Sequence, residues 1–283
     1  MPTLAELVCY PIKSCAGISL SEATLAATGL ANRHVRDREW MVVDENGGFL
    51  TQRQHPRMAL ITPRIGQETL ELNAPGMRPL ELPLAAPAAS VGRTVKASLW
   101  KRMIDVLDCG VTAAKWLSDV IGTQCCLVRF HPDAVHLSNP QWTGGIEAPN
   151  LFSDGYPVLI ISQASLDDLN EKLIAQGRDA LPMNRFRPNL VLDGIGAFEE
   201  DHAREIRIGD AVLKPVKPCP RCPIPSVDQA TGIVGPDPLD ILRTYRADPR
   251  VDGGITFGMN AILLMGEGTT LRVGQDIEVE LDF

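Results

Sequence analysis

The chain has 283 residues, of which 45% are hydrophobic and 22% are charged, and its formal net charge is −8. This composition is typical of a folded globular protein with one large or two modest domains, and the acidic balance argues against nucleic-acid binding through phosphates. The longest apolar runs, such as residues 261–265, are far shorter than the ~20 residues that span a bilayer, so we expect no membrane partner.

The cysteines and the N-terminal residues bear on the cellular compartment. Seven cysteines are present, an odd number, and their spacing is not that of a disulfide framework. The first 15 residues lack a basic segment followed by an apolar one, and their pattern predicts a strand from the start. We therefore expect free thiols and a cytoplasmic protein.

Short strands dominate the predicted structure up to about residue 110. An Asp-Glu-Asn-Gly-Gly turn at 44–48 predicts a hairpin, because Asn-Gly and Gly-Gly accept positive φ. We expect this part to form a small all-β barrel or sandwich. Its predicted strands lie at 3–9, 18–23, 40–43, 49–52, 58–61, 70–72 and 80–82.

From residue 111 onward the pattern adds helices to the strands. Helical spacing predicts a helix over 111–121 that Gly122 ends, and a second helix from Ser162 or Ser165 to about Gln176. The fold class is therefore expected to be mainly β with a few helices. The other predicted elements are strands at 125–130, 157–161, 190–192, 205–208, 212–216, 258–264 and 276–281, a long loop at 131–150 and a short helix at 238–245.

A pair of cysteines, Cys219 and Cys222, is the first candidate for chemistry. No second Cys-x-x-Cys supplies the further ligands of a structural zinc site. A thioredoxin-like dithiol opens a helix, whereas four prolines at 218–225 predict a rigid loop here. Two interpretations stay open: two unreactive core thiols, or a thiolate beside Arg221 that binds a soft metal or acts as a nucleophile.

Three other segments contain cations that could bind an anion. Asn-Arg-Phe-Arg-Pro-Asn at 184–189 suits phosphate, which the arginine fork binds in a bidentate manner. Lys13 and Ser14 lie in a turn that could form an anion nest. Strand alternation predicts that Arg36 and Arg38 share one face. Each segment alone could be a solvated surface, but together they favour a small polyanion carrying a soft metal or reactive sulfur.

Six motifs in order resemble a known family. They are Tyr-Pro-Ile-Lys-Ser-Cys-x-Gly at 10–17, Arg-Asp-Arg-x-Trp at 36–40, Arg-Phe-Arg-Pro-Asn at 185–189, Cys-x-Arg-Cys at 219–222, Val-Asp-x-x-Thr-Gly at 227–232 and Phe-Gly-x-Asn at 257–260. The chain resembles, over nearly its whole length, the MOSC proteins with an N-terminal β-barrel module, including the amidoxime-reducing components and related bacterial molybdenum enzymes. The resemblance implies an N-terminal MOSC-type module at 1–110 and a MOSC domain that binds the molybdenum cofactor at 111–283.

The resemblance also implies roles for individual residues. Cys222 would be the metal ligand and a catalytic residue, and Asp154 would be a second catalytic residue that handles protons near the metal. The other implied residues would bind the cofactor: its phosphate through Lys13, Ser14 and Arg38, its pterin through Arg187 and Asn189, and its remaining contacts through Pro220, Arg221 and Asn260.

The expected activity is reduction of N-hydroxylated compounds, such as hydroxylamines, amidoximes and N-hydroxylated bases, to amines. No four-cysteine iron–sulfur spacing occurs, so electrons would come from a separate protein, such as a flavin reductase or an iron–sulfur or haem carrier. One alternative is a non-catalytic sulfur-carrier or cofactor-delivery protein that uses Cys222. Another is a dithiol oxidoreductase that uses Cys219 and Cys222 equally.

Overall fold

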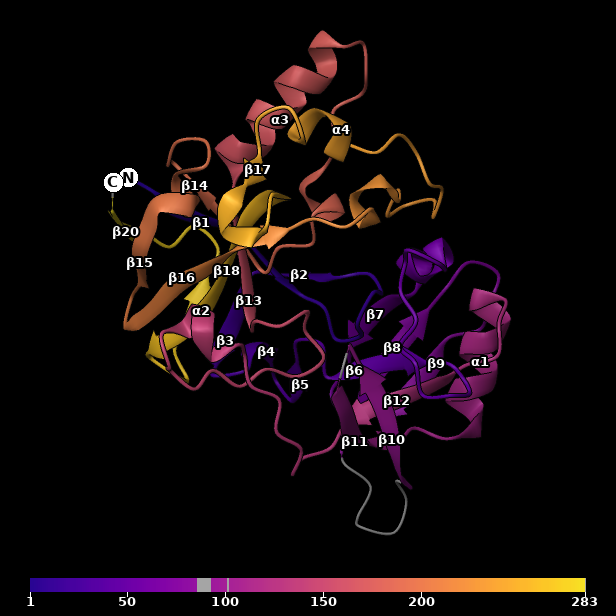
Figure 1. Ribbon diagram of the computed structural model, residues 1–283. Helices are drawn as coiled ribbons and strands as arrows, with labels where there is room; N and C mark the ends of the chain where they lie inside the picture. The colour runs from indigo at the N-terminus through magenta and orange to yellow at the C-terminus, as the bar shows by residue number, and fades with distance from the viewer. Residues whose placement is uncertain (86–92, 101, 283) are drawn as a thin grey trace.

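A computed structural model describes residues 1–85, 93–100 and 102–282. Strands dominate the described part, which confirms the mainly β fold class (Figure 1). All seven cysteines are free thiols. None of the helices that the structure describes is long and apolar enough to span a bilayer.

The largest sheet joins the two ends of the chain. Its strand order is β2-β1-β14-β13-β18-β16-β15-β20, and β17 pairs with β18. The first strand of the chain therefore pairs with β14, which lies about two thirds of the way along the sequence. The bounds are β1 Thr3–Cys9, β2 Ile18–Leu20, β13 Val158–Ser162, β14 Leu190–Asp193, β15 Ala203–Ile208, β16 Ala211–Pro220, β17 Ala247–Asp248, β18 Gly254–Met265 and β20 Glu278–Leu281.

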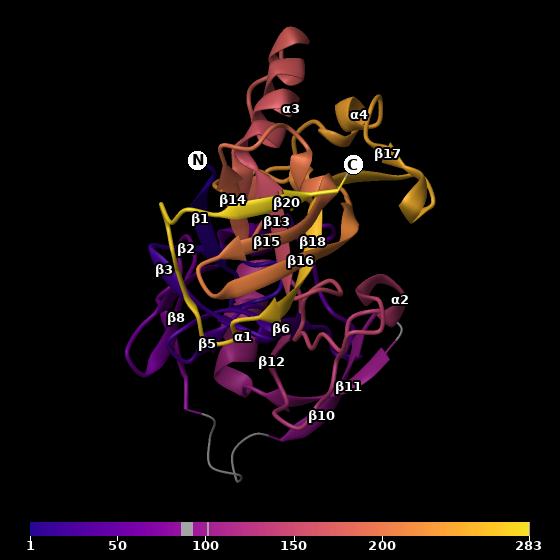
Figure 2. The same cartoon turned by 90° about the vertical axis from the view of Figure 1, so that its left-hand side faces the viewer.

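Three smaller sheets complete the strand architecture. Their orders are β10-β11-β12-β6, β19-β3-β4-β5 and β7-β8-β9. The sheet of β10, β11 and β12 lies at the end of the molecule opposite α3 (Figures 1 and 2). The bounds are β3 Glu22–Ala26, β4 Gly29–Asn32, β5 Val35–Arg36, β6 Trp40–Val43, β7 Thr62–Ile65, β8 Thr69–Asn73, β9 Leu80–Pro83, β10 Thr94–Leu99, β11 Arg102–Asp108, β12 Cys126–Phe130 and β19 Thr270–Arg272.

The two predicted longer helices are confirmed with their end signals. Gly122 ends α1 in the left-handed conformation at φ 81°, and the Ser162 side chain caps α3 by accepting the Ser165 N–H. The α-helices are α1 Val111–Ile121, α2 Pro140–Thr143, α3 Gln163–Ala175 and α4 Leu239–Leu242. The 3-10 helices are η1 Pro56–Leu60, η2 Met183–Arg185, η3 Glu199–His202, η4 Ile224–Ser226 and η5 Pro249–Val251.

Two predicted strands are wrong. Residues 58–61 lie mainly in η1, because Pro56 fixes the φ of its first turn and the chain turns before β7 begins. Residues 49–52 form no strand, and Phe49 makes only an isolated bridge to Val43 across the predicted turn. The turn itself is present, because the Asp44 N–H donates to the Gly48 carbonyl.

The prediction of a loop after the 212–216 strand is also wrong. Strand β16 continues to Pro220 and therefore contains Cys219. It carries Pro215, Pro218 and Pro220 beyond Leu213, the last residue that pairs with β15, so β18 is the one partner strand of this part. The register against β18 shifts beside these prolines. Irregular pairing of this kind accommodates residues that have no N–H to donate. Of the two cysteines in the 219–222 motif, Cys222 is the one that lies beyond the strand.

The predicted domain boundary between residues 110 and 111 stays a prediction. Helix α1 and strand β12 lie beyond it, yet β12 pairs with β6 and β11, and the apolar face of α1 packs into the cluster that contains Trp40 and Leu70. A second cluster, around Leu4 and Leu190, lies within the largest sheet. The chain therefore crosses between the two cores several times.

Candidate functional site

All ten predicted site residues line one cavity of about 290 Å³. The cavity lies where the largest sheet meets the loops of the smaller sheets, and its walls come from segments far apart in the sequence. The structure thus gathers the predicted residues, while their individual roles stay predictions. They are Lys13, Ser14, Arg38, Asp154, Arg187, Asn189, Pro220, Arg221, Cys222 and Asn260.

The cavity wall is strongly cationic in an otherwise acidic chain. Among the described residues that line it, six carry a positive charge and one, Asp154, carries a carboxylate. The six cations are Lys13, Arg38, Arg53, Arg187, Lys217 and Arg221. Like charges gathered around one cavity repel each other and attract an anion, so this wall favours an anionic ligand.

Lys13 is buried and forms an ion pair at the cavity wall. Its Nζ donates to the Phe152 carbonyl at 2.8 Å and pairs with Asp154, whose side chain is 76% exposed. Burial lowers the pKa of Lys13, which Asp154 only partly offsets. Desolvation opposes ionisation of Asp154, but the Lys13 charge, reinforced by two arginines, holds the pKa of that carboxyl below its usual range. Asp154 is therefore ionised near neutral pH.

Arg38 is held by a buried polar network. Its guanidinium pairs with Asp37 and donates to Asn189 Oδ1 at 3.0 Å. Asp37 in turn accepts the Tyr10 N–H at 2.8 Å and Asn189 Nδ2 at 3.0 Å. Asn189 therefore positions Arg38 as well as lining the cavity, because its two amide atoms bind both members of the ion pair.

Four of the cavity cations form no ion pair among the described residues, and Arg187 is the buried one of these four. Its side chain is buried, with 8% of the residue exposed, and its Nη1 has no hydrogen-bond partner among the residues that the structure describes. Burial lowers its pKa. A buried guanidinium left with an unused donor is costly, so this group indicates a site for an anion that the chain itself does not supply.

Three of the residues that line this cavity have a left-handed backbone conformation. Ser14, Arg38 and Arg187 have φ values of 64°, 49° and 59°, a region that non-glycine residues rarely occupy. The predicted shared face of Arg36 and Arg38 is wrong for this reason. Strand β5 ends at Arg36, and the left-handed turn sends only Arg38 to the cavity. Such strain persists where surrounding contacts enforce it, and it is typical of functional sites.

The two cysteines of the 219–222 motif have different surroundings. Cys219 packs against the cluster around Phe186 and Phe257, and its Sγ accepts a hydrogen bond from Arg221 Nη1 at 3.3 Å. Cys222 is half-buried, lies outside the apolar clusters of the described residues and faces the cavity. Cys219 is also half-buried and lines the same cavity, so the two thiols differ in their packing and in the Arg221 contact rather than in exposure. Arg221 is anchored by donating to the Phe186 carbonyl at 2.7 Å.

Several cavity residues were not predicted from the sequence. Trp100 lies at the tip of the β10–β11 hairpin, about 60 residues after the nearest predicted motif at 36–40, and no local signal marks it. Arg53 stacks on Trp100 at 5.5 Å. Gln52, next to the cavity residues Thr51 and Arg53, donates to the Ser14 carbonyl at 2.9 Å and pairs with Gln229. These residues are recognised as part of the site or its surroundings only through contacts between distant segments of the chain.

Comparisons with known proteins match most of the chain. Residues 1–124 match the MOSC N-terminal beta barrel domain, and residues 147–278 match the MOSC domain. The chain is 40% identical over 252 residues to mitochondrial amidoxime-reducing component 1 of Mus musculus, with 87% of this chain and 72% of that protein covered. It is 38% identical over 264 residues to mitochondrial amidoxime reducing component 2 of Rattus norvegicus, with 88% and 74% covered.

Proposed function

The chain belongs to the family of proteins with a MOSC N-terminal β-barrel domain and a MOSC domain, and on that premise we propose that it is a molybdenum-cofactor-dependent oxidoreductase. Its proposed reaction is R–NHOH + 2e⁻ + 2H⁺ → R–NH₂ + H₂O, with hydroxylamines, amidoximes or N-hydroxylated bases as substrates. Relatives named amidoxime-reducing components support this reaction type. The electrons come from a separate redox protein, of the flavin, iron–sulfur or haem class.

One observation carries the proposal: two half-buried thiols, Cys219 and Cys222, and six cations line the same cavity of an acidic chain. A thiolate is a ligand for soft, high-valent metals, and a group of cations binds a phosphate. The two chemistries are those of the two ends of a phosphorylated metal–pterin. A cofactor of this kind therefore accounts for thiols and cations lining the same cavity.

The residues present fit such a group. The unpartnered Nη1 of Arg187 is a buried donor that needs an acceptor, and Lys13 and Arg38 lie on the same wall. The described residues contain no cluster of three or more His, Cys, Asp or Glu side chains that could hold a bare metal ion. The proposal therefore has Cys222 as the protein ligand and the pterin sulfurs as the others.

When bound, the cofactor supplies two-electron redox chemistry at its metal. The chain binds and orients it: Cys222 would hold the metal, and Lys13, Ser14 and Arg38 the phosphate. Arg187 and Asn189 would bind the pterin, and Pro220, Arg221 and Asn260 line the wall beside it. The proton-handling role that the resemblance implies for Asp154 stays a prediction, because its pKa is lowered beside Lys13 and a lowered pKa makes the carboxylate a weaker proton acceptor near neutral pH.

The test is the metal content of the full chain produced in a host that makes molybdopterin. We expect about one molybdenum per chain with pterin fluorescence, and its loss in Cys222→Ala. A wild-type chain that contains neither metal nor pterin would overturn the proposal. A persulfide label on Cys222 in such metal-free protein would favour the sulfur-carrier alternative instead.

A further inference from the structure

Tyr10 contacts two of the cavity arginines. Its ring is buried, and the guanidinium carbons of Arg38 and Arg187 lie 4.4 Å and 4.3 Å from the ring centre. Distances of this size are typical of a cation on an aromatic face. Tyr10 directly follows β1, its N–H donates to Asp37 and its carbonyl accepts the Arg38 N–H, so its position is fixed by β1 and by the turn before β6.

The charges around this ring do not balance. Lys13 pairs with Asp154 and Arg38 pairs with Asp37, whereas Arg187 has no carboxylate within ion-pair distance among the described residues. Two guanidinium groups on one ring repel each other, and burial strengthens that repulsion. Something must hold them in place before a ligand arrives, and the aromatic ring is the group that contacts both.

We propose that Tyr10 is a positioning residue that holds Arg38 and Arg187 as a paired site for a phosphate dianion. The proposal rests on the proposed function, since the dianion is there the phosphate end of the cofactor. It departs from it at Arg187, which it assigns to the phosphate in place of the pterin contact that the resemblance implies. The ring attracts each guanidinium through its negatively charged face and so offsets part of their repulsion. Both arginines then meet a doubly charged ligand without further rearrangement, which lowers the cost of binding.

The phenol group does not compensate the arginines. Burial raises the pKa of Tyr10 to about 12, so the hydroxyl stays protonated at neutral pH. The hydroxyl is also buried with no hydrogen-bond partner among the described residues. The ring, rather than the hydroxyl, therefore carries the proposed role, and Tyr10→Phe and Tyr10→Leu separate the two.

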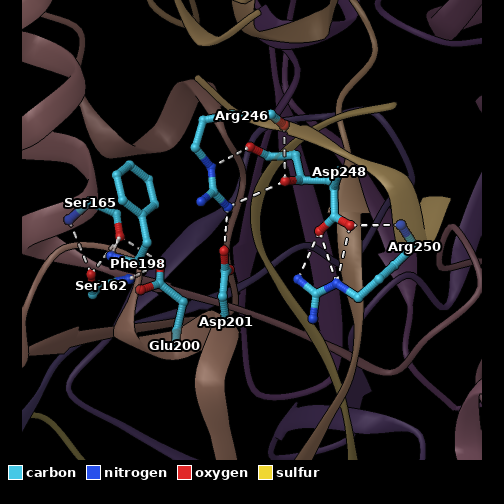
Figure 3. A network of polar contacts seen from close by, with 9 residues as sticks. Ser162, Ser165, Phe198, Glu200, Asp201, Arg246, Asp248 and Arg250 are labelled. Carbon is cyan, nitrogen blue, oxygen red and sulfur yellow. Dashed lines mark hydrogen bonds and ion pairs between the residues drawn. The ribbon is translucent and has the colours of Figure 1, made fainter. Parts of the chain in front are cut away.

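Phe198 offers a matched control outside the cavity. Its ring carries Arg246 at 4.1 Å in a network that does not line the cavity (Figure 3). Phe198→Leu removes the same kind of contact and a similar amount of apolar surface. An effect of Tyr10→Leu that Phe198→Leu does not reproduce is therefore specific to the paired arginines.

The experiment measures inorganic phosphate binding to the cofactor-free full chain by calorimetry, and molybdenum content after production in a molybdopterin-competent host. We expect phosphate to bind Tyr10→Leu about tenfold more weakly, the effect of losing two stacked cations. Tyr10→Phe and Phe198→Leu should bind within twofold of the wild type. Where Tyr10→Leu fails to fold, Tyr10→Met fills the same space without an aromatic face and takes the same measurements.

The outcomes separate this proposal from the proposed function. A folded Tyr10→Leu chain with wild-type phosphate affinity overturns the role of Tyr10, even where the wild type holds molybdenum. Equal losses in Tyr10→Phe and Tyr10→Leu also overturn it, since the hydroxyl would then be responsible. A wild-type chain that binds phosphate in a Tyr10-dependent way but holds no molybdenum supports the positioning role and counts against the oxidoreductase. A wild type that binds no phosphate overturns the positioning role.

Discussion

Replacing Arg187 by methionine should change the stability of the cofactor-free protein little while it weakens ligand binding sharply. The guanidinium of Arg187 is buried, has no ionic partner among the described residues and leaves Nη1 without a hydrogen bond. Methionine fills similar space with an apolar, flexible side chain. The left-handed backbone at this position is unchanged, because methionine has the same restrictions there as arginine.

Opposing contributions set the expected change in stability. Removing a buried unsatisfied donor relieves about 1–3 kcal/mol, while losing the contact with the Tyr10 ring costs about 0.5–2 kcal/mol. The net free energy of unfolding should therefore change by between about −1 and +2.5 kcal/mol. For a chain of this size we expect Tm to change by between about −2 and +5 °C.

The same substitution should weaken binding of an anion sharply. A hydrogen bond to a charged group contributes about 1.5–3 kcal/mol, which corresponds to a loss of roughly ten- to a hundredfold in affinity. Calorimetry with inorganic phosphate measures this loss directly in the cofactor-free chain. Molybdenum content after production in a competent host provides an independent measure.

Arg185 is the matched control two residues away. Its guanidinium pairs with Asp228 at 2.7 Å and donates to the Pro225 and Ser226 carbonyls. Arg185→Met should therefore lower stability by about 1–3 kcal/mol, seen as a lower Tm. If Arg187→Met lowered Tm as much as Arg185→Met does, Arg187 would have partners of its own, and the argument for an uncompensated charge would be refuted.

Three further outcomes follow from other contacts. Asp154→Asn should bind inorganic phosphate about fivefold more tightly in low-salt calorimetry, since the carboxylate no longer competes for Lys13; unchanged affinity would contradict this competition. Elemental analysis should find most of the molybdenum retained in Cys219→Ala and lost in Cys222→Ala, whereas equal losses would favour the dithiol alternative. Burial raises the pKa of Glu200, so its contribution to stability is present at low pH and falls as pH rises through the raised pKa (Figure 3). Glu200→Gln should therefore gain stability relative to the wild type in urea unfolding as pH rises above the ordinary pKa of a glutamate, and a pH-independent difference would count against this reasoning.

The sequence predicts the residues of the cavity better than the contacts among them. Motifs such as 10–17 and 219–222 mark segments whose side chains share one chemistry, and all ten predicted residues line the cavity. The contacts join positions far apart in the chain. Lys13 pairs with Asp154, 141 residues away, and Gln52 pairs with Gln229. Periodicity and turn signals describe neighbours along the chain, so they carry no information about such pairs.

Strand pairing shows the same limit. The strand at 3–9 is predicted correctly from its alternation, but its partner β14 is not, and neither is its membership of the largest sheet. Conversely, β16 has a composition that argues against a central strand, since it carries three prolines. Irregular pairing with β18 beside these prolines lets the strand continue to the cavity. Tertiary pairing overrides the local preference there.

Arg38 shows why local rules fail at the site itself. Alternation would continue β5 past Arg36, but the backbone of Arg38 is fixed from both sides: its N–H donates to the Tyr10 carbonyl at 2.7 Å, and its carbonyl accepts the Phe152 N–H at 3.0 Å. These two bonds tie the turn before β6 to the end of β1 and to the segment that carries Asp154. The strained φ of Arg38 is therefore enforced by the joining of three distant segments. The same joining places its guanidinium in the cavity, so the conformation that the sequence rules miss is the one that builds the anion site.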